Sequence, residues 1–145
     1  MGRREKKVGK RGSAGNNRKT GEDFLLKNLN RSGVVETDSG LQYMVVEQVD
    51  GEKPNVNSVI EIHQRALLLN GTILEDTYRK NEPANIPVNE LIEGLQEGVA
   101  LMGKGSRYKF WVPYDLAWGK KGSGNKIPPY SVLSFDIRLL SLQNG

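Results

Sequence analysis

The chain has 145 residues, of which 37% are hydrophobic and 26% charged, with a formal net charge of +4. These values suit one domain with a single core, and no apolar run reaches the ~18 to 20 residues that a membrane helix needs. Because the sequence has no cysteine and one histidine, His63, it excludes disulfides, thiolate catalysis and multi-histidine zinc sites and argues against a Ser-His-Asp triad.

Positive charge is concentrated in residues 1–20, which contain eight Lys or Arg and one acid, Glu5. Residues 21–145 hold the other 13 basic and 16 acidic groups, a net −3. With Val8 as its one substantial hydrophobe, the first segment cannot bury enough surface to offset chain entropy, and we predict a disordered basic tail over residues 1–20. It contains no apolar signal-peptide core, so we expect a cytoplasmic protein; a periplasmic location stays open if a signal was removed before this numbering.

Residues 21–40 predict a short helix followed by a connector. Glu22 and Asp23 fall in the first turn, where the helix dipole favours acids, and residues 24–29 supply apolar side chains. The helix is expected to end near residues 31–33.

From residue 41 onward the hydrophobic period changes to two, which indicates β-strands. The predicted strands cover residues 41–46, 60–68, 72–74, 107–112 and 133–139. Asn70-Gly71 is a strong hairpin signal between the second and the third, and residues 86–88 suit a short edge strand. Trp111 shares a strand face with charged neighbours, so we expect it to be half-exposed.

One helix is predicted among these strands. Asn89 can cap a helix over residues 90–101, with a buried stripe of Leu91, Leu95, Val99 and Met102. Gly94 and Gly98 lie on one face of it, each at a cost of ~1 kcal/mol relative to Ala, which indicates a helix pressed close to a sheet. We therefore predict an α+β domain over residues 41–145: about five antiparallel strands around one short helix.

Several short motifs follow one another across residues 55–142. They are Asn70-Gly71-Thr72, Leu91-Ile92-Glu93-Gly94-Leu95-Gln96-Glu97-Gly98-Val99, Val112-Pro113, Leu116-Ala117-Trp118-Gly119, Ile127-Pro128-Pro129 and Leu133-Ser134-Phe135-Asp136. In order and spacing they resemble the FKBP-type peptidyl-prolyl cis-trans isomerases, and residues 33–43 are similar to the segment before this domain in bacterial Mip-like members. Those members usually have a helical dimerisation domain where this chain has its basic tail, so we do not infer from the resemblance that this chain forms a dimer.

The resemblance implies a site of named residues. It implies catalytic roles for Gln64, Glu75, Ile92, Trp118 and Phe135, and substrate binding by Leu74, Ala84, Ile86, Leu91, Leu95 and Ile127. The family usually has tyrosine at 64, phenylalanine at 74, aspartate at 75, phenylalanine at 84, tryptophan at 95 and tyrosine at 118. Because aliphatic side chains replace aromatic ones, we expect weak isomerase activity and weak binding of macrolide immunosuppressants.

Each candidate also has a plain structural interpretation. Gln64 is either a pocket-wall amide or a strand-end residue bonded to nearby backbone. Trp118 is either an indole donor or a loop anchor packed on the core, and Glu75 either orients pocket groups or is a solvated acid. Ile92 is either a backbone N–H donor or an ordinary core residue. Phe135 is either the floor of the pocket or an ordinary core residue.

The chemistry implied by the resemblance needs no nucleophile, and we expect no metal and no cofactor. The barrier to peptide-bond rotation, ~18 to 20 kcal/mol, comes from amide resonance, so a catalyst has only to bind the twisted amide better than the planar forms. We predict a folding catalyst that isomerises Xaa-Pro bonds of proline-containing polypeptides, with no membrane partner. Two alternatives stay open: a non-catalytic peptide-binding chaperone, and an RNA- or ribosome-associated protein that uses residues 1–20.

Overall fold

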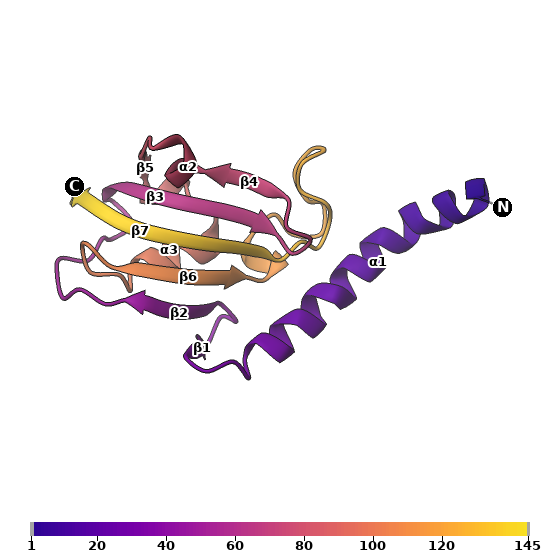
Figure 1. Cartoon of the computed structure of the whole chain (residues 1–145), viewed down its shortest axis with the longest axis horizontal. Helices are drawn as coiled ribbons and strands as arrows, with labels where there is room; N and C mark the ends of the chain where they lie inside the picture. Colours follow the sequence, from indigo (N-terminus) through magenta and orange to yellow (C-terminus); the bar gives the residue numbers. More distant parts are fainter. Residues whose placement is uncertain (1, 145) are drawn as a thin grey trace.

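The computed structural model describes residues 2–144, with side chains from residue 14 onward. Its main feature is one antiparallel sheet of seven strands, ordered β1-β2-β6-β7-β3-β4, with β5 also beside β3 (Figure 1). The strands are β1 (Val34–Glu36), β2 (Gln42–Glu47), β3 (Val59–Leu68), β4 (Ile73–Asp76), β5 (Ala84–Pro87), β6 (Arg107–Val112) and β7 (Leu133–Gln143). The predicted α+β class is confirmed. The edge strand expected at residues 86–88 corresponds to β5, and the added strand is β1, which is too short to show a period of two.

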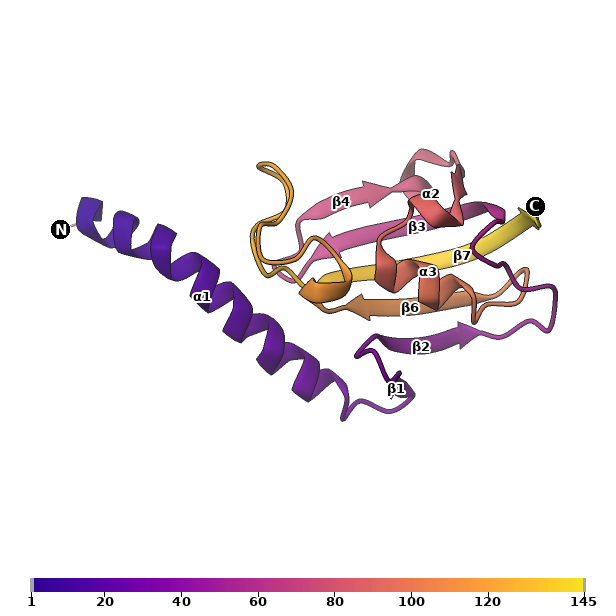
Figure 2. The same ribbon diagram turned by 180° about the vertical axis from the view of Figure 1, so that it is seen from behind.

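Three α-helices and two short 3-10 helices complete the fold. They are α1 (Gly2–Asn28), α2 (Thr77–Lys80), η1 (Val88–Glu90), α3 (Glu93–Val99) and η2 (Tyr114–Leu116). α3 crosses one face of the sheet, here called the inner face, whereas α1 extends away from it (Figure 2). α2 begins directly after β4, where Asp76 caps it by accepting a hydrogen bond from the Arg79 N–H.

The contact between α3 and the sheet depends on two glycines. A Cβ on Gly98 would lie 2.6 Å from the Phe110 ring, and one on Gly94 would lie 2.5 Å from Cγ1 of Val112. Both distances are shorter than real Cβ contacts allow, so the helix can lie this close only with glycine at both positions. The predicted close approach of helix and sheet is confirmed.

The start of α3 differs from the prediction. Asn89 does not cap it; that residue lies inside η1, and the N-cap of α3 is Ile92, which makes no side-chain capping bond. The backbone of Ile92 is extended, with φ −58° and ψ 153°, so a helix cannot pass through it. The helix therefore begins three residues later than expected.

The helix α1 covers residues for which composition predicts disorder. It runs from Gly2 to Asn28 without a break at residue 20. Residues 17–21 contact residues 128–132, more than a hundred positions away, and such a contact cannot be anticipated from composition.

Trp111 is buried, with 5% of its surface exposed, so the expectation of a half-exposed ring was wrong. The guanidinium of Arg31 lies 5.4 Å from its ring centre. The turn that follows α1 therefore covers a side chain that the strand alone would leave in solvent.

Candidate functional site

The inner face of β3 and β5 forms an aliphatic surface. Ile60 and Ile62 of β3 are fully buried and lie opposite Ile86 and Ala84 of β5 in the strand register. Because directly paired residues share a face, the two half-buried β5 side chains extend the core toward the edge of the sheet.

The other apolar residues implied by the resemblance, Phe135 among them, lie in or beside the same core. Leu95 on α3 and Phe135 on β7 are buried members of it, with 2% and 7% of their surface exposed. Half-buried side chains packed against it include Leu74, Ala84, Ile86, Leu91, Ile92 and Ile127. The structure therefore brings these eight residues to one core, two inside it and six at its surface.

The backbone carbonyl of Ile92 is hydrogen-bonded, whereas its N–H is not bonded within residues 14–144. Its carbonyl accepts hydrogen bonds from the N–H groups of Leu95 (2.9 Å) and Gln96 (3.1 Å) at the start of α3. Within residues 14–144, its own N–H has no acceptor. A free donor at the border of an apolar surface can bind a carbonyl group of a ligand.

Gln64 is held by its backbone. Its N–H donates to Oγ1 of Thr77 (2.6 Å), and the Thr77 hydroxyl lies 3.3 Å from its carbonyl oxygen. Its side chain falls on the inner face, between Ile62 and Ala66 in the alternation of β3. Among the described residues its amide group has no hydrogen-bond partner, so the amide is available to a ligand.

Glu75 behaves as a solvated acid. Its side chain is 41% exposed and forms an ion pair with Lys80, Oε1 to Nζ 3.1 Å. The same oxygen accepts a hydrogen bond from the Asp76 N–H (2.9 Å). These bonds, that of Lys80 first, lower the pKa of Glu75. The carboxylate is thus directed to α2.

Trp118 lies in the loop between η2 and β7 with 46% of its surface exposed. Its neighbour Ala117 packs against the core, as does Ile127 later in the same loop. An indole exposed to this degree does not anchor the loop, and its N–H can reach a ligand.

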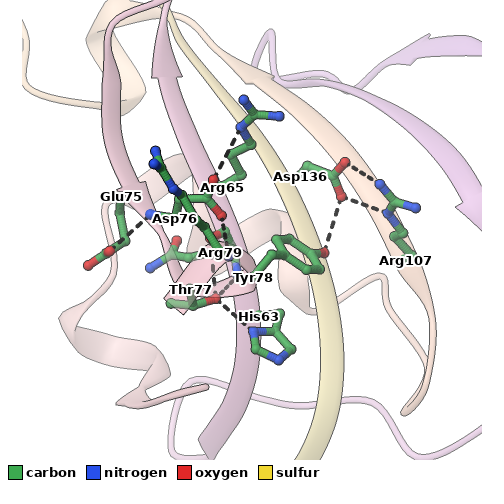
Figure 3. Close-up of polar contacts among 10 residues, drawn as sticks. His63, Arg65, Glu75, Asp76, Thr77, Tyr78, Arg79, Arg107 and Asp136 are labelled. Carbon is green, nitrogen blue, oxygen red and sulfur yellow. Dashed lines mark hydrogen bonds and ion pairs between the residues drawn. The ribbon is translucent and has the colours of Figure 1, made fainter. Parts of the chain in front are cut away.

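The opposite face of the sheet carries a polar network that we did not predict (Figure 3). Arg107 of β6 binds Asp136 of β7 through two bonds, 2.9 Å from Nε and 2.7 Å from a terminal nitrogen. The hydroxyl of Tyr78 lies 3.3 Å from the same carboxylate. Burial and the Asp136 charge raise the pKa of Tyr78 to about 12. Bonding to Asp136 raises the pKa of Arg107.

The same network holds α2 against β3. Nδ1 of His63 is 2.9 Å from Oγ1 of Thr77, and its ring stacks on Tyr78 with centres 5.0 Å apart. Arg65 forms an ion pair with Asp76 (3.6 Å). A groove of about 380 Å³ lies between these side chains. Since its carboxylates are already paired, we interpret the network as structural; only the strand register, which sequence does not reveal, could have predicted it.

The described residues offer neither a metal site nor a membrane helix. No group of three or more His, Cys, Asp or Glu side chains there is placed to hold a metal ion. Nor does any described helix combine the length and hydropathy that crossing a bilayer requires.

The structure has the fold of an FKBP-like domain. The crystal structure of FkpA from Escherichia coli matches with a TM-score of 0.88 and 31% identity, over 94% of this chain and 64% of that one. A peptidyl-prolyl cis-trans isomerase from Pseudomonas syringae matches with a TM-score of 0.81 and 25% identity, over 87% of this chain and 92% of that one.

Family models lead to the same class. The model described as FKBP-type peptidyl-prolyl cis-trans isomerase matches residues 50–140, more than half of the chain. The chain therefore belongs to the FKBP-type peptidyl-prolyl cis-trans isomerase family. A second model, described as the domain amino terminal to FKBP-type peptidyl-prolyl isomerase, matches residues 2–45. The segment that we interpreted as a basic tail therefore resembles the amino-terminal domain of that family.

Curated relatives extend beyond the length of this chain. The FKBP-type isomerase FkpA of Aeromonas hydrophila is 41% identical over 127 residues, 88% of this chain and 47% of that protein. The 22 kDa FKBP-type isomerase of Escherichia coli is 37% identical, over 84% of this chain and 59% of that protein. The chain thus spans about half the length of these relatives. A relative from Legionella longbeachae, 33% identical over 89% of this chain and 55% of that protein, is named an outer membrane protein, which gives the expected cytoplasmic location no support.

Proposed function

We propose that this domain catalyses cis-trans isomerisation of Xaa-Pro bonds in polypeptides and thereby assists folding. The observation that carries the proposal is the free N–H of Ile92 at the border of an aliphatic surface. The family and the names of its relatives support the same reaction.

In this mechanism the surface around Leu95 and Phe135 binds the proline ring. The Ile92 N–H holds a substrate carbonyl, which fixes one side of the peptide bond while the other rotates. A twisted amide has less charge separation than a planar one. It therefore loses less hydration free energy than the planar form does when it moves from water to an apolar surface. No bond is made or broken, and the gain comes from tighter binding of the twisted form.

Gln64, Trp118 and Glu75 have supporting roles in the proposal. The Gln64 amide and the Trp118 indole N–H are donors at the rim, where they can orient the substrate backbone. Glu75 acts through its ion pair with Lys80, which holds the β4–α2 junction next to Leu74. Leu74, Ala84, Ile86, Leu91 and Ile127 supply apolar contact.

A proline substitution tests the Ile92 donor directly. Proline has no N–H, and its fixed φ of about −65° is close to the −58° of Ile92. Leu91 before it is extended (ψ 156°), as a residue before proline must be. We expect Ile92→Pro to lower kcat/KM about tenfold, roughly 1.4 kcal/mol of lost binding to the transition state.

Ile92→Ala is the matched control, because it removes the side chain and keeps the N–H. If both variants lose activity equally, the side chain and not the donor matters, and the mechanism is wrong. A wild-type rate indistinguishable from buffer would instead favour the peptide-binding chaperone. The RNA- or ribosome-binding alternative depends largely on the basic side chains of residues 1–13, which lie outside the described residues.

A further inference from the structure

A contact between α1 and the loop before β7 joins two segments that are far apart in sequence. The side-chain amide of Asn17 donates hydrogen bonds to the carbonyl of Pro129 and, at 3.3 Å, to Oγ of Ser131. The Ser131 hydroxyl in turn donates to the carbonyl of Pro128 (2.7 Å). One α1 side chain thus binds both the backbone and a side chain of this loop.

The next residue of α1 adds an aromatic contact. The guanidinium of Arg18 lies 5.3 Å from the ring centre of Tyr130 and 6.0 Å from that of Tyr114. The two rings meet edge to face, with centres 4.8 Å apart. Arg18 therefore covers a pair of tyrosines that joins the two ends of the loop.

Gly21 sets the distance between helix and loop. It is buried, and a Cβ at this position would lie 2.8 Å from Cγ2 of Val132. α1 can rest on Val132 only because this position has no side chain. A cavity of about 200 Å³ lies beside the contact, between α1, residues 68–70 and the loop residues Pro128, Ser131 and Val132.

The contacted residues control the shape of the loop. Tyr130 has φ +60°, a left-handed conformation that non-glycine residues rarely adopt. Its N–H donates to the carbonyl of Gly119 (3.0 Å), which ties the far end of the loop to its beginning. Between these points lies Ile127, held by two backbone bonds to Ser123 (2.8 and 3.1 Å). Trp118 immediately precedes Gly119.

We propose that α1 is a positioning element for the isomerase site. Through Asn17, Arg18 and Gly21 it holds residues 119–132 in the conformation that places Trp118 and Ile127 beside the aliphatic surface. None of the three α1 residues touches the substrate. This inference rests on the proposed function, because Trp118 and Ile127 matter only if that surface binds proline peptides.

Two glycines of α1 make a matched test. Gly21→Ala and Gly15→Ala both replace a helical glycine by a better helix former. A Cβ at Gly15 has nothing within 4 Å, whereas one at Gly21 meets Val132. Only Gly21→Ala should therefore separate α1 from the loop.

We expect Gly21→Ala to speed amide hydrogen exchange across residues 119–132 and to lower kcat/KM about tenfold, mainly through KM. Gly15→Ala should match wild type in both. Arg18→Ala, which introduces no clash, should shift both readouts in the same direction as Gly21→Ala, and Lys19→Ala, with the same loss of charge from an exposed position, should not.

The outcomes separate the two proposals. If exchange and kinetics of Gly21→Ala match those of Gly15→Ala, α1 does not position the loop and the inference fails. Faster exchange with unchanged kcat/KM also overturns it, because the contact then has no effect on the site. If the wild type itself does not accelerate isomerisation, calorimetric affinity for a proline-containing peptide replaces kcat/KM, so the inference is tested even when the proposed function has failed.

Discussion

Arg107 and Asp136 face each other across strands β6 and β7 and share two hydrogen bonds, of 2.9 and 2.7 Å. Their side chains are only 36% and 19% exposed, so the pair is partly shielded from water. Arg138 and Glu47 form a one-bond pair of 2.9 Å in which the carboxylate is 56% exposed. The two pairs therefore offer a comparison of a shielded with an open ion pair on one sheet.

We predict that Asp136→Asn lowers the free energy of unfolding by ~1 to 2 kcal/mol, because it leaves the half-shielded guanidinium without its counter-charge. Glu47→Gln should change it by no more than ~0.5 kcal/mol, as is usual for exposed pairs. Urea denaturation of both variants measures the difference. Equal effects would show that shielding does not strengthen the Arg107 pair.

Tyr78 should make stability fall at high pH. Its pKa is raised from 10.0 to about 12, chiefly by burial and then by the Asp136 charge, so the folded state holds the phenolic proton more tightly than the unfolded state. That stabilisation is complete below pH 10 and is lost as the pH rises toward 12. Melting temperatures across this range should fall more steeply for wild type than for Tyr78→Phe, and parallel curves would refute the assignment.

Gly98→Ala should destabilise the domain although alanine favours helices by ~1 kcal/mol. The added methyl group would meet the Phe110 ring at 2.6 Å and push α3 from the sheet, a cost of ~1 to 3 kcal/mol. Phe110→Leu removes the obstructing ring, so the double variant should be more stable than the sum of the two single effects predicts. Additive effects in chemical denaturation would mean that the helix moves without strain.

An aromatic ring at position 84 should strengthen ligand binding. Ala84 is half-buried on β5, opposite Ile62, and Ala84→Phe would add apolar area at ~25 cal/mol per Å². We expect macrolide affinity and kcat/KM to rise about tenfold, which corresponds to roughly 1.4 kcal/mol.

The control for this variant is Ile73→Phe, which adds a ring at an exposed position that pairs with Leu67 on the other face. It should leave both quantities unchanged. Calorimetry and a prolyl-isomerase assay measure them. A similar rise in the two variants would show that added hydrophobicity, and not its place, strengthens binding.

Sequence alone predicted the features that depend on neighbours in the chain. The period of two predicted the long strands, and the glycines at 94 and 98 predicted a helix close to a sheet. β1 was missed because a strand of three residues contains too few alternations, whereas the edge strand expected at residues 86–88 corresponds to β5 with its bounds shifted by a few residues. Asn89 predicted a cap because capping is a local signal, yet the extended backbone of Ile92 decides where the helix begins.

Sequence motifs indicated which apolar residues meet at one core, but not the backbone geometry beside that core. The motifs identified the aliphatic residues that meet at one core, whereas the free N–H of Ile92 depends on the backbone conformation at the start of α3. The network of Tyr78, Arg107 and Asp136 arises from strand register, and the contact of Asn17 with Pro129 from a docking event between distant segments. Neither contact can be predicted from the local sequence pattern.

The position of β7 has a consequence for how the chain folds. β7 pairs with β3 along ten residues and with β6 along six, so it lies in the middle of the sheet although it is the last strand in chain order. Among the described strands, β7 alone joins the β1-β2-β6 group to the β3-β4-β5 group, so the two groups cannot form one sheet until residues 133–143 emerge from the ribosome. Such non-local pairing makes folding slow. The domain therefore completes its sheet only after β7 is synthesised, and its unpaired strand edges need protection until that strand is inserted.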